Sequence, residues 1–366
     1  MSLLKAVIEI TIGTYYDNRP KDHSEDGLGA PIVDGVGFIV VEIVTPEKDL
    51  IAQIRGLAKV TLNPSIRTGI GDDCAVLRLP GGRGRQNDTL VTTDFSLEGI
   101  HFRRDSHPPA AVGHRCLARG LSDIAAMGGD PVAAFLSLAL PGDLPPNWKR
   151  GFTRGLISLA KKYGVTLAGG DTAESPGGIL ADIVVLGVVP QGTAVLRSRA
   201  RAGDLIYVSG ELGGSAAAVR KFGKKSRVNP RAYPRHYFPD PRVTLGRTLR
   251  EKKIASAMID TSDGLSTDLA HICEESGVGA EVLSEALPLA QVGKPRRAVD
   301  LELALHGGED YELLFTAHRS LRVPSQIAGV PITQIGRITR DQKMFLINRS
   351  GVASKLEPRG WEHFRR

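Results

Sequence analysis

The chain is organised around residues 91–131, which begin with Val91-Thr92-Thr93-Asp94-Phe95-Ser96 and continue into Leu121-Ser122-Asp123-Ile124-Ala125-Ala126-Met127-Gly128. The first segment has the pattern of a β-strand that stops at an acid. The second lies near the end of a predicted helix, whose apolar residues recur at helical spacing: Val112, Cys116, Leu117, Gly120, Ile124 and Met127. At about 100° per residue, Asp123 falls inside this apolar stripe.

A carboxylate on a core-facing stripe requires a compensating charge, because burying it alone is very costly. The helix by itself leaves two partners open for Asp123. One is Arg119, one turn earlier on the same face, as an i,i+4 ion pair. The other is a metal ion.

The composition is that of an ordinary globular protein of 366 residues, with 42% hydrophobic residues available for a core. No apolar run approaches the length of a membrane span, and Glu9 comes too early for a signal peptide. The three cysteines, Cys74, Cys116 and Cys273, are odd in number and far apart. This usage predicts reduced thiols and a cytoplasmic location, without a disulfide framework or a zinc site.

The net charge of +7 comes largely from basic runs at 197–201, 221–235 and 359–366. Nucleic-acid binding would be favoured by aromatic residues between the basic ones, and these are few. The pattern favours a solvated basic face and, next, an anionic small molecule such as a nucleotide. We expect no nucleic-acid partner.

Predicted strands and helices mix without strict βαβ alternation, which indicates an α+β fold in two mixed-layer domains. The boundary is expected at 190–203, where a turn and a basic run precede a new strand. The domains are then 46–190 and 191–366, after an N-terminal extension at 1–45. The most regular predicted elements are helices at 146–163 and 242–251 and strands at 131–140, 165–168, 179–189, 205–209 and 257–260.

Five acidic spots share one pattern, in which one or two acids stand among small residues at a predicted strand or turn end. They are Asp72-Asp73, Thr92-Thr93-Asp94, Asp123, Gly170-Asp171 and Asp260-Thr261-Ser262-Asp263. Taken singly, Asp263 is a helix N-cap, Asp72 a turn residue and Asp171 a loop residue.

The repetition of this pattern predicts a cation site. Two carboxylates about 5 Å apart repel by roughly 3 kcal/mol at an effective dielectric of about 20, so a folded protein would gather several only around cations. Carboxylate and hydroxyl oxygens suit Mg²⁺. No His-rich or Cys-rich spacing indicates a softer metal.

Several common phosphate-handling motifs are missing from the sequence. It contains no G-x-x-x-x-G-K-[ST] loop, no strand followed by G-x-G-x-x-G, no protein-kinase motif set and no G-x-S-x-G elbow. An enzyme acting on phosphates would therefore hold them through bridging metal ions and scattered Arg or Lys. This is sufficient, because phosphoryl transfer needs positioning and charge neutralisation more than covalent chemistry.

Seven ordered motifs between residues 46 and 366 resemble those of the thiamine-monophosphate kinases, of the aminoimidazole-ribonucleotide synthetase-like superfamily. The motifs are Gly69-Ile70-Gly71-Asp72-Asp73, Thr92-Thr93-Asp94, Glu98-Gly99-Ile100-His101-Phe102, Leu121-Ser122-Asp123-Ile124-Ala125-Ala126-Met127-Gly128, Gly169-Gly170-Asp171-Thr172, Ile259-Asp260-Thr261-Ser262-Asp263-Gly264 and Gly307-Gly308-Glu309-Asp310-Tyr311-Glu312-Leu313. Any one is weak, but the ordered set is specific.

The resemblance implies an ATP-dependent transfer of the γ-phosphoryl group to thiamine monophosphate, which gives thiamine diphosphate. It implies Mg²⁺ ions held by Asp73, Thr92, Thr93, Asp94, Asp123, Asp171, Asp260 and Asp263. It implies ATP contacts from Gly170, Asp171, Arg197 and Ser262, and a substrate side made by His101, Glu309 and Trp361. It also implies a homodimer in which the N-terminal domains pair and their sheets form a β-barrel.

The chemistry of the substrate agrees with these implied roles. Thiamine carries a cationic thiazolium, for which Glu309 and the face of Trp361 are suitable partners. The acceptor is a phosphate monoester that is already nucleophilic at neutral pH, so no general base is assigned and His101 would bind phosphate. Which of Arg197, Arg199 and Arg201 meets ATP is left open.

The chain departs from the family pattern at two places. Arg119-Gly120 stands where a smaller neutral pair is usual before the Leu-Ser-Asp motif. Arg199 and Ala202 stand where a Gly and a Pro are common.

Two other functional classes are weighed against the kinase. One is a sibling enzyme that makes selenophosphate or a cyclised purine precursor. Selenophosphate synthesis would require a reactive N-terminal Cys or its equivalent, and the earliest here is Cys74. The other is a non-catalytic module that binds nucleotides or nucleic acid through the basic runs, with a steep salt dependence.

Overall fold

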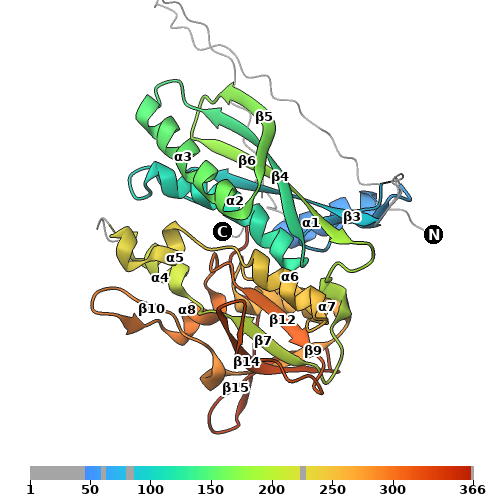
Figure 1. Ribbon diagram of the computed structural model, residues 1–366. Helices are drawn as coiled ribbons and strands as arrows, with labels where there is room; N and C mark the ends of the chain where they lie inside the picture. Colours follow the sequence, from blue (N-terminus) through green and yellow to red (C-terminus); the bar gives the residue numbers. More distant parts are fainter. Residues whose placement is uncertain (1–45, 59–62, 80–85, 223–227, 364–366) are drawn as a thin grey trace, which may run out of the picture. The chain divides into compact units, whose positions relative to one another are not determined.

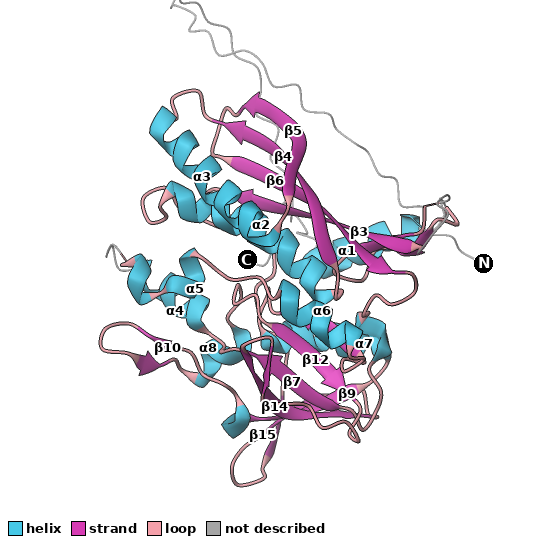
Figure 2. Ribbon diagram, in the orientation of Figure 1, coloured by secondary structure: helices cyan, strands magenta, loops and turns pink. Residues whose placement is uncertain are grey.

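The computed structural model describes residues 46–58, 63–79, 86–222 and 228–363. The predicted extension at 1–45 lies outside the described residues. Two sheets dominate the fold, one built from residues before 191 and the other from residues after 204 (Figures 1 and 2). The mixed α+β expectation is confirmed in this two-sheet form.

The first sheet has six strands in the order β1-β2-β3-β6-β4-β5. Its neighbouring strands are antiparallel except for the β4–β5 pair, which is parallel. The strands are β1 Ile66–Thr68, β2 Ala75–Leu77, β3 Asn87–Leu97, β4 Asp130–Leu140, β5 Thr166–Glu174 and β6 Leu180–Pro190.

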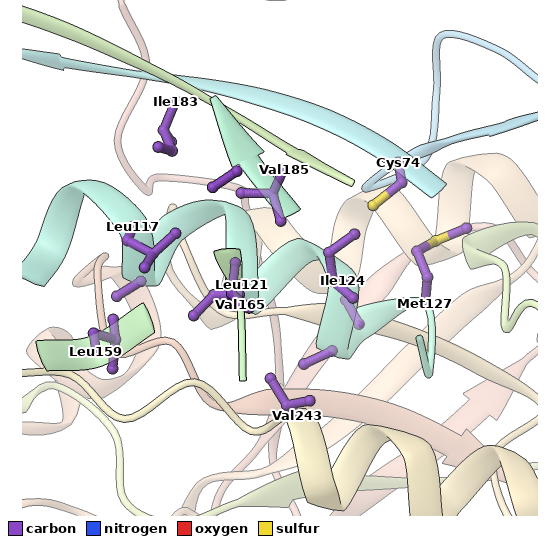
Figure 3. Packing of buried hydrophobic residues seen from close by; sticks show 14 of the residues in the cluster. Cys74, Leu117, Leu121, Ile124, Met127, Leu159, Val165, Ile183, Val185 and Val243 are labelled. Atoms are coloured by element: carbon purple, nitrogen blue, oxygen red, sulfur yellow. The ribbon is translucent and has the colours of Figure 1, made fainter. Parts of the chain in front are cut away.

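Two long helices, α2 (Pro109–Ala126) and α3 (Pro146–Tyr163), pack against this sheet (Figure 1). Both begin with Pro in the first turn, where the missing N–H costs nothing. The helices approach closely because Gly113 of α2 faces the backbone of α3 and Gly155 of α3 faces the backbone of α2. A Cβ on either glycine would lie 1.9 Å from a backbone oxygen of the other helix. Figure 3 shows Leu117, Leu121 and Ile124 of α2 in one buried cluster with Ile183 and Val185 of β6 and Leu159 of α3.

The second sheet follows the order β16-β15-β9-β14-β7-β12-β8, and β13 pairs with β14. The β9–β15 pair is parallel and the other pairs are antiparallel. The strands are β7 Leu205–Ser209, β8 Ala257–Asp260, β9 Gly279–Leu283, β12 Leu313–Ala317, β13 Gln326–Ile327, β14 Val330–Thr339, β15 Met344–Ile347 and β16 Ala353–Lys355. A separate ribbon joins β10 Gln291–Val292 to β11 Arg297–Ala298.

Shorter helices accompany the second sheet. They are α4 Gly214–Phe222, α5 Pro234–Tyr237, α6 Val243–Glu251, α7 Leu265–Ser276 and α8 Leu301–His306, with 3₁₀ turns η2 Arg197–Arg199, η3 Pro230–Ala232 and η4 Ser284–Ala286. Helix α1 (Glu47–Ala58) is tied to α7 by ion pairs from Lys48 to Glu274 and from Arg55 to Glu275. No helix among the described residues is long and apolar enough to cross a membrane.

The strongly periodic elements lie where the sequence predicts them. Helix α3 spans the predicted 146–163 and ends at Gly164, whose φ of 66° is the left-handed value that a glycine cap provides. Strands β7 and β8 also match their predicted bounds.

Two predicted strand boundaries are wrong. The strand expected to stop at Asp94 runs on to Leu97 in β3, paired with β6 along its length. The strand expected at 165–168 runs on to Glu174, so Gly170 and Asp171 lie inside β5 and not in a loop. The strand continues because β5 pairs with β4 along its length, with Gly170 opposite Leu136. A Cβ at Gly170 would lie 1.8 Å from the Leu136 carbonyl oxygen, so this pairing depends on glycine.

Candidate active site

Three predicted metal ligands from distant parts of the chain converge. Asp73 follows β1, Asp123 lies on α2, and Asp260 ends β8. Each offers a carboxylate oxygen, and the three oxygens lie within 4.8 Å of one another. Asp73 and Asp260 are buried and Asp123 is half-buried.

Two hydroxyl groups fix the orientation of these carboxylates. Thr92 Oγ1, on β3, donates a hydrogen bond to Asp123 Oδ2. Ser122 Oγ donates to Asp260 Oδ2 at 2.5 Å. Adjacent residues of α2 therefore contact both sheets: Asp123 contacts β3 and Ser122 contacts the end of β8.

The acids destabilise each other's charges. Burial, and then the charges of Asp94 and Asp260, raise the pKa of Asp123 well above its ordinary value. Burial and the charge of Asp73 raise the pKa of Asp260 to about 8. Burial also raises the pKa of Asp94 against the opposing charge of Arg119. Asp94 thus belongs to the same electrostatic cluster.

Two further acids lie at the edge of this cluster. Burial and then the Asp73 charge raise the pKa of Asp72 to about 7. Burial and then Glu47, on α1, raise the pKa of Asp263 to about 6. Because every ligand atom is a hard oxygen and the carboxylates are held close against their repulsion, the donor set fits a divalent cation such as Mg²⁺.

Arg197 supplies the positive charge nearest the acids. Its Nη2 donates to Asp73 Oδ1 at 2.7 Å, its Nε to Oδ2 at 3.3 Å, and its backbone N–H to Asp72 Oδ2 at 3.2 Å. Arg199, in the same 3₁₀ turn, is exposed. The geometry singles out Arg197 at the acids, and its contact with ATP stays a prediction.

The ion pair between Arg119 and Asp123 is absent, so that alternative is wrong. Arg119 Nη2 donates to Glu309 Oε1 at 2.7 Å, and its Nη1 donates to the Phe95 carbonyl oxygen at 3.1 Å. The guanidinium bonds to partners that are distant along the chain, and helical spacing does not reveal such partners.

Three predicted site residues lie apart from the acidic cluster. Thr93 is exposed and its hydroxyl donates to Asp182 at 2.7 Å, because successive side chains of a strand point to opposite faces. Asp171 is exposed in β5, where its Oδ1 accepts only the neighbouring Thr172 N–H at 2.8 Å among the described residues. Gly170 lies beside it. Their predicted roles remain predictions.

The predicted substrate side is built around Glu309. Arg115 and Arg119, one turn apart on α2, donate to the same oxygen, Oε1, at 2.5 and 2.7 Å. Burial works against the charge, but the two arginines hold the pKa of Glu309 below its ordinary range. Glu309 also has a φ of 67°, which is uncommon for a residue with a side chain.

His101 and Trp361 lie close to this side. His101 Nδ1 accepts the Leu97 N–H at 3.0 Å, which leaves Nε2 to carry the proton of the neutral ring. Burial and then the charge of Arg119 lower the pKa of His101 to about 3. His363 lies edge-on to both rings, with centroids 5.5 Å from His101 and 5.7 Å from Trp361, whose side chain is exposed.

The loop 260–264 connects the two sides through its backbone. The Ser262 carbonyl accepts the Glu309 N–H at 2.7 Å, and the Asp263 carbonyl accepts the Trp361 N–H at 2.9 Å. The cap of α7 is Gly264 and not Asp263; Asp268 reaches back and accepts the Gly264 N–H at 3.0 Å.

The sequence did not assign Arg115, Arg119, Ser122, Asp268 or His363 to the site. Ser122 could have been found because it precedes Asp123 in a quoted motif. Arg119 could have been found because Arg119-Gly120 departs from the family pattern. Arg115 and His363 carried no such signal, because their partners, Glu309 and His101, are distant in the sequence.

The chain matches a known protein family over most of its length. Residues 71–189 match the family described as AIR synthase related protein, N-terminal domain, and residues 201–348 match the corresponding C-terminal domain. The thiamine-monophosphate kinase of Salmonella typhimurium is 39% identical over 313 residues, which cover 82% of this chain and 92% of that protein.

Solved structures share the fold. The structure of AaThiL complexed with AMPPCP and TMP has a TM-score of 0.75 and 32% identity, and the match covers 89% of this chain and 100% of that one. The thiamine-monophosphate kinase of Stenotrophomonas maltophilia K279a has a TM-score of 0.67 and 35% identity, covering 86% of this chain and 98% of that one.

Proposed function

The chain belongs to the thiamine-monophosphate kinase family, and from that premise we propose that it transfers the γ-phosphoryl group of ATP to thiamine monophosphate. The products are thiamine diphosphate and ADP. The observation that carries the proposal is the convergence of Asp73, Asp123 and Asp260 within 4.8 Å, beside the Arg115–Glu309–Arg119 cluster.

The reaction requires little covalent chemistry from the protein. An oxygen of the acceptor's phosphate forms a bond to Pγ, and the bond from Pγ to the oxygen bridging to the β-phosphate breaks, so that its electron pair leaves with ADP. The acceptor oxygen carries no proton that must be removed at neutral pH, so no general base is needed. Positioning and charge neutralisation remain as the tasks of the site.

The metal site would be formed by the acids of the cluster. We assign Mg²⁺ binding to Asp73, Asp94, Asp123, Asp260 and Asp263, with Thr92, Thr93 and Asp171 as further ligands on the family resemblance. Mg²⁺, when bound, neutralises charge on the phosphates. The residues themselves hold their oxygens in place through Thr92, Ser122 and the backbone of loop 260–264.

The two substrates are assigned to opposite ends of the acidic cluster. ATP would contact Gly170, Asp171, Arg197 and Ser262, and Arg197 is favoured over Arg199 and Arg201 by its place at Asp73. Thiamine monophosphate would contact His101, Glu309 and Trp361. The donor set of His101 agrees with an anion, since Nε2 carries its N–H outward from the Leu97 contact.

The proposal includes the domain organisation and a homodimer. The domains are 46–190 and 191–366, with an extension at 1–45, and the first sheets of two copies would form a barrel. The support is an apolar sheet face: Phe95 is 54% exposed, Val132 49% and Phe135 37%. Monomeric proteins rarely expose such neighbouring large side chains. The three cysteines are free and buried, which fits a cytoplasmic enzyme.

The test is a product assay with a panel of acceptors. The purified protein, with ATP and Mg²⁺, should convert thiamine monophosphate into thiamine diphosphate with one ADP per product, and should not phosphorylate unphosphorylated thiamine at a comparable rate. A folded protein that binds ATP and forms no thiamine diphosphate would overturn the proposal. The selenophosphate alternative is disfavoured because Cys74 is buried.

A further inference from the structure

Arg119 is a buried guanidinium with unused N–H donors among the described residues. The residue is 9% exposed. Its Nη1 and Nη2 donate to the Phe95 carbonyl and to Glu309, but no described residue accepts a hydrogen bond from its buried Nε. Buried N–H groups in folded proteins nearly always have a partner, so this donor points to a ligand.

Arg119 also stands between the two halves of the site. It lies one helical turn before Asp123 on α2, so the two side chains are neighbours on that helix. Its charge acts on Asp94, on the metal side, and on His101, on the substrate side. A group bound beside Arg119 would therefore be close to both.

The Glu309 carboxylate has one free oxygen. Both arginines use Oε1, and no described residue donates a hydrogen bond to Oε2. The pair thus presents a carboxylate oxygen and a guanidinium N–H close together. A ligand that carries a cationic ring and an anionic phosphate would satisfy both at once.

Arg115 contacts the same carboxylate but is less accessible than Arg119. It is 3% exposed, against 9% for Arg119, and its Nη1 donates to the His236 carbonyl while its Nη2 donates to Glu309. Arg115 therefore holds Glu309 in place, whereas Arg119 is the more accessible of the two guanidinium groups.

We propose that Arg119 binds the phosphate of the acceptor through the unpaired N–H groups of its guanidinium, while Glu309 Oε2 faces the acceptor's cationic ring. This assignment rests on the proposed function. It makes Arg119 a substrate-binding residue particular to this chain, because the position usually holds a smaller neutral residue in the family pattern described above.

The experiment compares two ligands that differ only in the phosphate. Binding of thiamine monophosphate and of thiamine is measured by calorimetry on the wild-type protein and on Arg119→Met and Arg119→Lys. Arg119→Met should weaken thiamine monophosphate about 10- to 100-fold, the effect of losing a charge-assisted hydrogen bond, and thiamine less than about threefold. Arg119→Lys, which keeps the charge, should recover part of the loss. KM for ATP should stay unchanged.

A purely structural role gives a different result. If Arg119 only supports Glu309, the variant weakens both ligands equally, and this would overturn the proposal. An unchanged affinity for thiamine monophosphate would also overturn it. If Arg119→Met does not fold, Arg119→Leu, which also lacks every side-chain N–H, gives the same comparison.

Arg250→Met serves as the matched control. Its guanidinium is also buried, with Nε donating to the Gly128 carbonyl at 2.6 Å, and it takes no part in the proposed site. It should leave the ratio of the two affinities unchanged; a ratio that falls as in Arg119→Met would overturn the inference. Failure of the wild-type protein to bind or phosphorylate thiamine monophosphate would instead defeat the proposed function.

Discussion

Buried carboxylates are compensated differently on the two sides of the site. At the acidic cluster, carboxylates from α2, β8 and the turn after β1 face one another, and burial raises the pKa values of Asp123 and Asp260. At the substrate side, Glu309 is enclosed by Arg115 and Arg119, which hold its pKa below the ordinary range. The acidic cluster requires cations from solution, whereas the substrate side has its own positive charges, Arg115 and Arg119. Removing a carboxylate should therefore have opposite effects on stability at the two sides.

The largest effect is expected from neutralising an acid of the cluster. Asp123→Asn should lower kcat by about 10³-fold, because the variant loses a ligand for the charge that neutralises the phosphates. Its free energy of unfolding without Mg²⁺ should stay the same or rise, because Asn resembles the protonated acid. Steady-state kinetics and denaturant unfolding in chelator measure both quantities. Asp94→Asn and Asp263→Asn should lose turnover in the same way, and near-normal rates in these variants would remove the metal-cluster assignment.

Glu309→Gln tests the other side and should have the opposite effect on stability. The change leaves Arg115 and Arg119 without their carboxylate, and removing one partner of a buried ion pair costs about 3 kcal/mol. Urea unfolding of this variant beside Asp123→Asn measures the contrast. Equal stability of the two variants would show that the sides do not differ as described.

The dependence of stability on pH gives a smaller effect. Asp260 has a folded pKa of about 8, above its unfolded value, so its contribution to the metal-free protein is present below the unfolded pKa and is lost as pH rises through about 8. Mg²⁺ should then stabilise the protein more at about pH 8 than at about pH 6, and at ten times its Kd the stabilisation at either pH is about 1.4 kcal/mol. Thermal unfolding with Mg²⁺ or chelator measures this. Asp260→Asn is the control, and it should flatten the pH dependence.

Gly164→Ala should have the smallest effect, and it serves as the reference for a loss of stability away from the site. Gly164 ends α3 at a φ of 66°, and a Cβ there would contact nothing within 4 Å, so the cost is backbone conformation alone. We expect a loss of about 1 kcal/mol of stability. KM and kcat should not change, and a change in either would show that stability losses alone alter the kinetics.

The acidic cluster was easier to predict from sequence than the substrate side. Each acid stands among small residues in a short motif, so the pattern is local and repeats, and Asp73, Asp123 and Asp260 do converge. Of the two partners left open for Asp123, the local one, Arg119, is excluded, because Arg119 pairs with Glu309, which lies far along the chain.

The register of the strands also could not be predicted from the sequence. Thr92 and Thr93 are adjacent in one motif, yet one hydroxyl reaches Asp123 and the other reaches Asp182 on the opposite face. Asp171 lies inside β5 because pairing with β4 extends the strand past two glycines that read as a loop. Both outcomes depend on tertiary pairing, which a single sequence does not encode in local pattern.

The backbone of loop 260–264 contacts residues on both sides of the site, so ordering it serves both substrates. The carbonyls of Ser262 and Asp263 accept hydrogen bonds from the amides of Glu309 and Trp361, while burial and then Glu47 raise the pKa of the Asp263 carboxyl. Whichever substrate arrives first therefore restrains main-chain atoms that the second also needs restrained. Each substrate should bind more tightly in the presence of the other, and the free-energy gain should be the same whichever is added first.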